Sequence, residues 1–309
     1  MSLTNTLKKY RWIIISLLLL SVITGVLYFY GKAIVKEFVQ LYVDRETAGA
    51  YILSYEELSY NLLDRSFSLS EVEFIPATDQ RDSSALQYKV SVKLMKAQIA
   101  DIVALYTDKI LHFSGIDVDQ PIVELYKTNA SKTAFTTDVG NLYLVISDYL
   151  KVLEIDYIDL KSGTFIYQNT KQTFNNIDFR ISSFRLDSNR SEKVFYSEEI
   201  DLKLEKQTIT LPDSVHEFSF SGFKLSTRDS MIRIDNVKIT PKGNVSEYPV
   251  AITADISAIT FIDIDFMKAY QLRQLVVDSL KISHPIASIY INGNINKTAP
   301  KLSLSRIFE

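Results

Sequence analysis

The chain of 309 residues contains no cysteine and only three histidines. The missing cysteines exclude a disulfide framework, a thiolate metal site and a cysteine nucleophile. The 34 basic and 37 acidic residues leave a net charge of −3, which does not supply the basic surface that nucleic-acid binding needs. We therefore expect no nucleic-acid partner.

Glycine and proline are also scarce, at 9 and 7 residues, whereas tyrosine and phenylalanine number 18 and 17. Tight turns depend on glycine and proline, while aromatic side chains favour strands. The composition therefore predicts a mainly β protein with long strands.

The longest uncharged run covers residues 12–30, WIIISLLLLSVITGVLYFY. At 1.5 Å per residue, a helix of this length crosses the hydrocarbon layer of roughly 30 Å. A cleaved signal peptide is the alternative, but its apolar region is shorter and ends in small residues. We expect a retained transmembrane helix with these residues at its two interfaces: Lys8, Lys9, Arg11, Trp12, Tyr28 and Tyr30.

The segments on either side of this run predict how the chain is oriented. Basic residues in the tail 1–11 favour its staying in the cytoplasm, so the body of the chain would be exported. Residues 31–50 carry apolar side chains at helical spacing and predict an extension of the helix. This apolar stripe would be covered by the body of the chain, by a partner helix or by the membrane surface.

From residue 51 to residue 309, apolar and polar residues alternate as they do in half-buried strands. In SFSLSEVEF, residues 66–74, the alternation slips by one position before Val72. We expect the following residues to share one apolar face: Phe67, Leu69, Val72, Phe74, Ile116, Val118, Ile200, Leu202, Leu204, Phe218 and Phe220.

Three stretches of helical period, at 94–110, 138–152 and 263–275, interrupt the strands. Each precedes a similar segment: LHFSGIDVDQPIVELY at 111–126, LEIDYIDLKSGTFIYQ at 153–168 and LVVDSLKISHPIASIY at 275–290. A turn former stands at the same place in each, as Pro121, Gly163 and Pro285. We interpret this as a repeated unit of helix, strand, turn and strand, which predicts antiparallel hairpins decorated with short helices.

The N-terminal anchor, SFSLSEVEFIP at 66–76 and the helix followed by IDVDQPIVELY at 116–126 resemble the AsmA-like group of bacterial envelope proteins, relatives of TamB. The resemblance covers about the first 170 residues and recurs near 263–290. It implies an antiparallel sheet curled into an apolar groove, anchored in the bacterial inner membrane and reaching into the periplasm. It also implies a role in moving phospholipid or maintaining the outer membrane. This chain is shorter than most members, so it is either a short member or acts with a longer envelope partner.

Alternation alone favours a closed core, in which a second sheet covers the apolar face, whereas the resemblance favours an open groove. An open groove would shelter acyl chains, whose exposure to water costs about 0.8 kcal/mol per methylene. We therefore hypothesise a periplasmic protein that binds phospholipid or another acyl-chain lipid. The alternative is a tethered β-domain that serves as a scaffold in an envelope complex without binding lipid.

Several acidic pairs invite an enzymatic or metal-binding interpretation, including Asp117 with Asp119, Asp156 with Asp159, and Asp263 with Asp265. They lie on the polar side of alternating segments, so a solvated strand face accounts for them. His112, His216 and His284 are far apart in sequence, and neither nucleophile elbows nor phosphate-binding loops occur. We expect no catalytic residues, no metal site and no cofactor.

Overall fold

The computed structural model describes residues 43, 49–61, 63–77, 87–101, 103–126, 147, 150–168, 172–188 and 196–292. The predicted anchor at 12–30, its interface residues and most of the extension at 31–50 lie outside these ranges. No helix in the part of the chain that the structure describes is long and apolar enough to span a bilayer.

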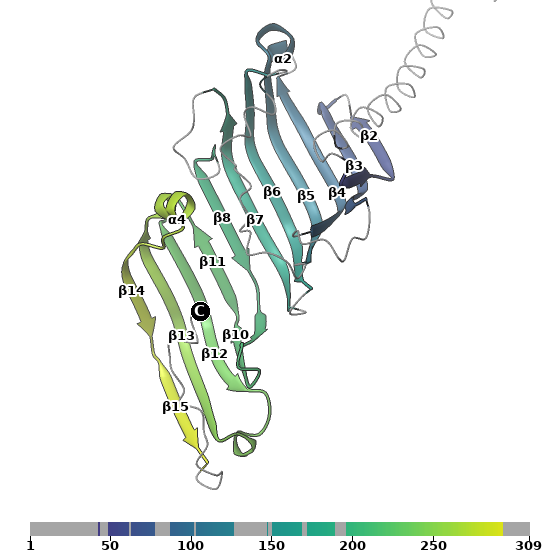
Figure 1. Cartoon of the computed structure of the whole chain (residues 1–309). Coiled ribbons are helices and arrows are strands. Elements are labelled where there is room, and N and C mark those ends of the chain that lie inside the picture. Colours follow the sequence, from purple (N-terminus) through teal and green to yellow (C-terminus); the bar gives the residue numbers. More distant parts are fainter. Residues whose placement is uncertain are drawn as a thin grey trace, which may run out of the picture.

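The described residues form one sheet of fifteen strands, with short helices at its margins (Figure 1). The strands of the first half are β1 (Tyr51–Ser54), β2 (Glu57–Asn61), β3 (Ser66–Pro76), β4 (Gln87–Asp101), β5 (Ile110–Tyr126), β6 (Val152–Tyr167) and β7 (Gln172–Leu186). Those of the second half are β8 (Glu199–Leu204), β9 (Gln207–Thr210), β10 (His216–Phe220), β11 (Gly222–Ser226), β12 (Met231–Pro241), β13 (Val250–Ile264), β14 (Val277–Ser283) and β15 (Ile286–Ile291). The helices are α2 (Val103–Asp108), the 3₁₀ helix η3 (Val245–Glu247) and α4 (Phe266–Leu272).

Pairs of short strands share a position in the sheet. β1 and β2 both pair with β3, β10 and β11 both pair with β12, and β14 and β15 both pair with β13. β8 and β9 likewise pair with the collinear strands β11 and β10. The fifteen strands therefore occupy eleven positions, in a linear order from β1/β2 to β14/β15.

The prediction of a mainly β fold is confirmed, but that of a curled, wholly antiparallel sheet is wrong. β5 and β6 pair in parallel, and all other strand pairs of the described sheet are antiparallel. The sheet is open rather than curled into a groove (Figure 1). β1/β2 and β14/β15 end the sheet at opposite edges and do not pair with each other, so the described strands do not close into a barrel.

The internal repeat is present, although its predicted turns are not. β5 and β6 pair in the register that the sequence comparison indicates, with Ile116 opposite Ile158 and Val118 opposite Leu160. Both strands run without reversal through Pro121 and Gly163, because a reversal there would break the ladders on both sides. The third copy is also collinear, since β14 and β15 flank Pro285 and both pair with β13.

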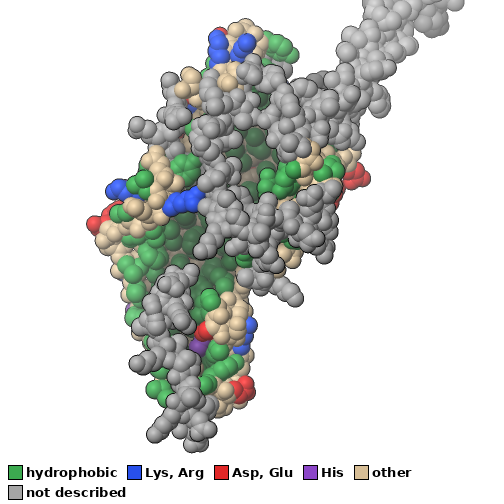
Figure 2. All heavy atoms as spheres, viewed as in Figure 1, with side chains coloured by type: hydrophobic (Ala, Val, Ile, Leu, Met, Phe, Trp, Pro, Cys, Tyr) green, Lys and Arg blue, Asp and Glu red, His purple; other side chains and the backbone are tan. Residues whose placement is uncertain are grey.

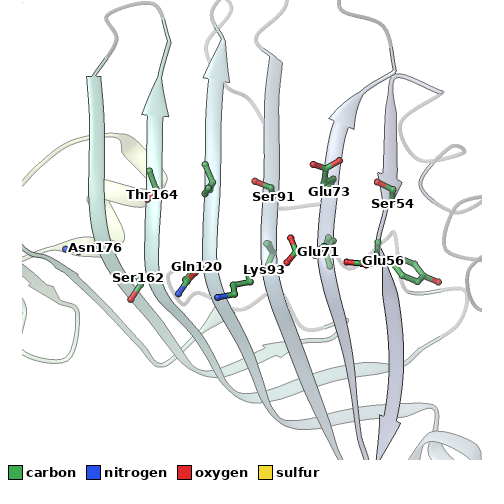
Figure 3. A pocket seen from close by; sticks show the side chains of 14 residues that line it. Ser54, Glu56, Glu71, Glu73, Ser91, Lys93, Gln120, Ser162, Thr164 and Asn176 are labelled. Atoms are coloured by element: carbon green, nitrogen blue, oxygen red, sulfur yellow. The ribbon is translucent and has the colours of Figure 1, made fainter.

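In place of turns, the strands carry residues with left-handed backbone conformation at one level of the sheet. We name this set the bulge line: Glu71, Gln120, Ser162, Asn176, Asn236 and His284, whose φ angles lie between 46° and 53°. Figure 3 shows four of them, with Lys93 between Glu71 and Gln120, in a row across neighbouring strands. A residue in this conformation interrupts the regular pleat, so that the alternation of the strand slips by one position. The pairing stays in register across Glu71 and Gln120, whereas a bulge-like register shift lies beside Ser162. The slip in SFSLSEVEF, residues 66–74, falls at Glu71, the first residue of the line.

The predicted helices are confirmed in part. Residues 266–272 form α4, and the Asp265 carboxylate caps it by accepting a hydrogen bond from the Lys268 N–H at 2.9 Å. Within 94–110 only 103–108 are helical in the described residues, and Met95 and Ile99 belong to β4. The apolar positions of that stretch fit both the helical period and the alternation of a strand. The hydrogen bonds of β4 with β3 and β5 favour the strand. Most of 138–152 lies outside the described residues.

Candidate functional site

One face of the sheet is apolar from edge to edge. Residues paired across neighbouring strands point to the same side, so the register traces rows of side chains on each face. We name the longest of these the central row: Leu58, Leu69, Met95, Val118, Leu160, Phe179, Leu202, Leu225, Ile232, Phe261 and Leu280, each paired with the next. It visits all eleven strand positions without meeting a polar residue.

Parallel rows widen this apolar face. On one side of the central row lie Tyr60, Phe67, Ala97, Ile116, Ile158, Ile181 and Ile200. On the other side lie Ile177, Leu204, Phe223, Ile234, Ile259 and Ile282. Figure 2 shows the result, with hydrophobic side chains gathered on the face turned to the viewer and charged ones towards its margins.

The bulge line keeps apolar side chains on this face where simple alternation would turn them away. Gly163 is an example: a Cβ built on it would lie 2.9 Å from Leu160 Cδ2 and 3.3 Å from Pro121 Cγ. Gly163 therefore faces the same side as Leu160, three residues before it. Beyond the bulge line the apolar face continues as Leu53, Phe74, Val90, Val123, Phe165 and Phe174, and as Phe218, Ile239, Ala254 and Ala287.

Aromatic rings reinforce the face beyond the bulge line. Phe74 stacks on Tyr51 at a centroid distance of 4.7 Å and on Tyr88 at 5.8 Å. Phe220 lies between Phe218 and Phe223, at 5.9 and 6.4 Å. Such pairs stabilise by roughly 0.5–1.5 kcal/mol beyond the area they bury. They therefore help to order a face that has no second sheet against it among the described residues.

The central row remains partly open to its surroundings. Leu58 is buried at one edge, Leu280 is 54% exposed at the other, and the nine residues between them are half-buried. A closed sandwich would bury all of them, because facing sheets interdigitate their side chains. The arrangement provides a long, continuous apolar surface.

The opposite face is polar and carries a lattice of opposite charges. The row paired as Lys96, Asp117, Asp159, Arg180 and Asp201 alternates in sign except at one step. Lys161 Nζ lies 3.1 Å from the Asp117 carboxylate, and that hydrogen bond raises the pKa of Lys161. Arg180 lies 3.4 Å from Asp159. The charged side chains of these pairs therefore lie on one face of the sheet, and the apolar rows lie on the other.

A trough of about 830 Å³ follows the bulge line on the polar side. Its lining includes Glu56, Glu71, Lys93, Gln120 and Asn176, which Figure 3 shows in a row across neighbouring segments of the sheet. All five side chains are exposed. Because the lining of the trough is largely polar, an apolar ligand gains little there compared with the other face.

The structure places all eleven residues named from the sequence on the apolar face. Leu69, Val118 and Leu202 belong to the central row, Phe67, Ile116, Ile200 and Leu204 to the flanking rows, and Val72, Phe74, Phe218 and Phe220 to the part beyond the bulge line. Their role in binding lipid stays a prediction.

The sequence interpretation missed other members of the same face. Met95 was assigned to a helix, and Phe179, Leu225 and Phe261 were not singled out. The alternation around Phe179 and Phe261 could have indicated them. What links them into one row is the pairing register, which depends on strand order.

His112, His216 and several members of the acidic pairs have structural partners. Asp156 binds His112 at 2.8 Å, and Asp117 and Asp159 take part in the charge lattice. His216 donates from Nδ1 to Asp213 at 2.6 Å, because its Nε2 accepts the Ile252 N–H at 2.9 Å. No cluster of His, Asp or Glu within the described ranges is arranged to hold a metal ion.

No model of a known protein family matches this chain, and a search of curated proteins found none similar to it. The resemblance to AsmA-like proteins therefore stays a prediction from the residues quoted for it.

Proposed function

We propose that this chain is a membrane-anchored, non-enzymatic protein of the bacterial envelope that binds phospholipid acyl chains along its apolar face. In this proposal residues 12–30 anchor it in the inner membrane, and the sheet lies in the periplasm. It would transfer lipid or maintain the outer membrane, as the resemblance to AsmA-like proteins implies.

The central row is the observation that carries this proposal. Eleven strand positions at about 4.8 Å each make a path of roughly 50 Å. Along it an acyl chain would meet apolar side chains throughout and avoid the cost of about 0.8 kcal/mol per exposed methylene. Because the sheet is open rather than curled, lipid would slide along a surface, with its headgroup free to stay in water.

A scaffold role in an envelope complex is the second candidate. The exposed side chains at one edge favour it, since Ile286, Ile289 and Ile291 are between 67% and 77% exposed. Contiguous apolar surface of this kind often marks a protein interface. In a scaffold, another protein rather than lipid would cover the apolar face.

Photo-crosslinking distinguishes the two candidates. The full chain, in membranes, would be exposed to a phosphatidylcholine that carries a diazirine at the end of one acyl chain, and labelled peptides would be mapped by mass spectrometry. We expect label on peptides of the central row as well as on residues 12–30. Label confined to residues 12–30 would contradict lipid binding by the sheet.

A pair of variants tests the assignment of the face. Leu202→Asp combined with Phe218→Asp puts two carboxylates on the apolar face, and we expect labelling of the sheet to fall severalfold. Lys203→Asp combined with Ser219→Asp changes neighbouring residues on the polar face of the same strands, and labelling should persist. Equal loss in both variants, with unchanged circular dichroism, would show that the face is wrongly assigned.

A further inference from the structure

His216 bridges the turn before β10 and the backbone of β13. Its Nε2 accepts a hydrogen bond from the Ile252 N–H at 2.9 Å, and its Nδ1 donates to the Asp213 carboxylate at 2.6 Å. That carboxylate also accepts the N–H groups of Val215 and His216, at 2.9 and 3.0 Å. The His216 side chain is only 9% exposed. Both ring nitrogens therefore have a partner in a place that is shielded from solvent.

The bridge lies where β12 ends. The pairing of β12 with β13 runs as far as Ile239 opposite Ala254, and β12 stops at Pro241, which pairs with His216 on its other side. Two residues before Ala254 in the chain, the partner of the Ile252 N–H is the imidazole. His216 thus continues the attachment of β13 beyond the last residue pair that β12 forms with it.

This bridge requires the neutral form of the imidazole. A backbone N–H can only donate, so Nε2 must carry a lone pair to accept it, and the ring proton is then on Nδ1. A protonated imidazole donates from both nitrogens and accepts at neither. On protonation the contact with Asp213 becomes an ion pair, whereas the contact with Ile252 is lost. The two protonation states of the ring therefore bind different partners.

Asp213 is the charged group in contact with the ring. In the strands around it, alternation places the charged residues nearest in sequence on the polar face, and Lys238 and Asp255 lie 3.3 Å apart there: Glu217 on β10, Lys238 on β12 and Asp255 on β13. β9 and β15 carry no charge. Lys242 and Glu247 lie in the connection between β12 and β13, and within the described ranges neither bonds to His216.

We propose that His216 is a pH-sensitive latch, which holds the Ile252 N–H when neutral and releases it when protonated. Histidine is the side chain whose charge ordinarily changes between about pH 5 and about pH 8. The protonated ring would keep Asp213 alone, so the start of β13 would open locally while the pairing from Ala254 onwards remains.

The latch also has a consequence for the apolar face. Phe218 lies on that face, and His216 is two residues away on the same strand, so both side chains point to the same side. Protonation would therefore bring a positive charge to the apolar face at this corner of the sheet. The latch itself does not depend on lipid binding, so either proposal can fail without the other.

Hydrogen–deuterium exchange of the full chain in membranes tests the latch. Exchange would be measured between about pH 8 and about pH 5 by mass spectrometry with fragmentation to single amides, and each rate would be corrected for the intrinsic rate at that pH. We expect the protection of the Ile252 amide to fall severalfold in acid. Ile256, opposite Val237 in the pairing of β12 with β13, is the internal control and should keep its protection.

Three variants assign the change to His216. His216→Gln keeps an acceptor for the Ile252 N–H but does not titrate, so protection of Ile252 should no longer depend on pH. Asp213→Asn removes the anion that favours the protonated ring, so the fall in protection should move to lower pH. His112→Gln is the matched control, because His112 also contacts a carboxylate, that of Asp156 at 2.8 Å, and should leave Ile252 unaffected.

Two results in the unsubstituted chain would overturn the inference. One is equal protection of Ile252 at the two ends of the pH range. The other is a fall that Ile256 shares, because acid would then unfold the sheet instead of opening one contact. A fall that persists unchanged in His216→Gln would overturn it as well, since another group would then be responsible.

Discussion

At the scale of single residues, the backbone of the bulge line is the most demanding feature. Left-handed conformation costs an ordinary L-residue roughly 1–2 kcal/mol, and asparagine tolerates it best. Asn176 and Asn236 therefore suit their places, and the Asn236 side chain also donates to Ser221 Oγ at 2.8 Å. The left-handed conformation costs more free energy at Glu71, Gln120 and Ser162. Backbone pairing with the neighbouring strands holds these residues in it.

Asn236→Val tests this cost. A β-branched residue at a φ of 50° is strained, so we expect the free energy of unfolding of the full chain in detergent to fall by about 1–3 kcal/mol. Urea titration followed by circular dichroism would measure it. Lys238→Val, two residues along the same strand, should change stability by no more than about 0.5 kcal/mol. Equal losses would show that the backbone at residue 236 is not strained.

The Asp213–His216 pair predicts a pH dependence. Burial alone would raise the pKa of the Asp213 carboxyl, but hydrogen bonds from His216 and the Val215 N–H outweigh it and hold the pKa below its ordinary value of 3.8. A carboxyl with a lowered pKa stabilises the fold above its ordinary pKa, and this stabilisation is lost as the pH falls through the lowered value.

Asp213→Asn measures that contribution. We expect the variant to melt at a lower temperature than the natural chain at neutral pH, because its amide cannot replace the ionised acceptor. The gap between the two melting temperatures should narrow below pH 3.8. A gap that stays constant with pH would show that the carboxylate charge contributes nothing.

At the scale of strands, the repeat and the parallel pair belong together. A match between residues 111–126 and 153–168 could be seen in the sequence because both strands present the same apolar face. Whether they form hairpins or neighbours depends on what lies between them and on which partners each strand finds. β4 pairs with β5, and β7 with β6, so both strands stay extended through Pro121 and Gly163.

Gly163→Leu tests the close packing at the β6 bulge. The added Cβ would lie 2.9 Å from Leu160 Cδ2 and 3.3 Å from the Ile177 backbone oxygen, so β6 and β7 would have to move apart. We expect a loss of about 1–3 kcal/mol in the free energy of unfolding. Gly222→Leu is the matched control, since its added Cβ would meet only Asp235 Oδ2 at 3.8 Å. If both substitutions cost the same, packing at the bulge is not what requires glycine.

At the scale of the whole molecule, the two faces of the sheet separate apolar from electrostatic interactions. Lipid binding on the apolar face should resist salt, because contacts between acyl chains and aliphatic side chains are not screened. The basic partners in the ion pairs of the opposite face are exposed, and salt screens charges at the surface over about 3 Å at 1 M.

We therefore expect labelling by the diazirine phosphatidylcholine to be unchanged when NaCl is raised from about 0.1 M to about 1 M. Labelled peptides of the central row, quantified by mass spectrometry, provide the measurement. A marked loss of label in high salt would mean that the charged face captures the lipid.

The sequence by itself determined the apolar side of the strands that it identified, the presence of a repeat and the mainly β character of the chain, because these depend on local alternation. It also indicated the slip before Val72. Tertiary structure decided the parallel pairing of β5 with β6, the open sheet and the extended course of the chain through Pro121, Gly163 and Pro285. The physical reason is that the backbone groups of a strand form hydrogen bonds with whichever neighbouring strand the whole sheet places beside it. The alternation of apolar and polar residues within one strand does not identify that neighbour.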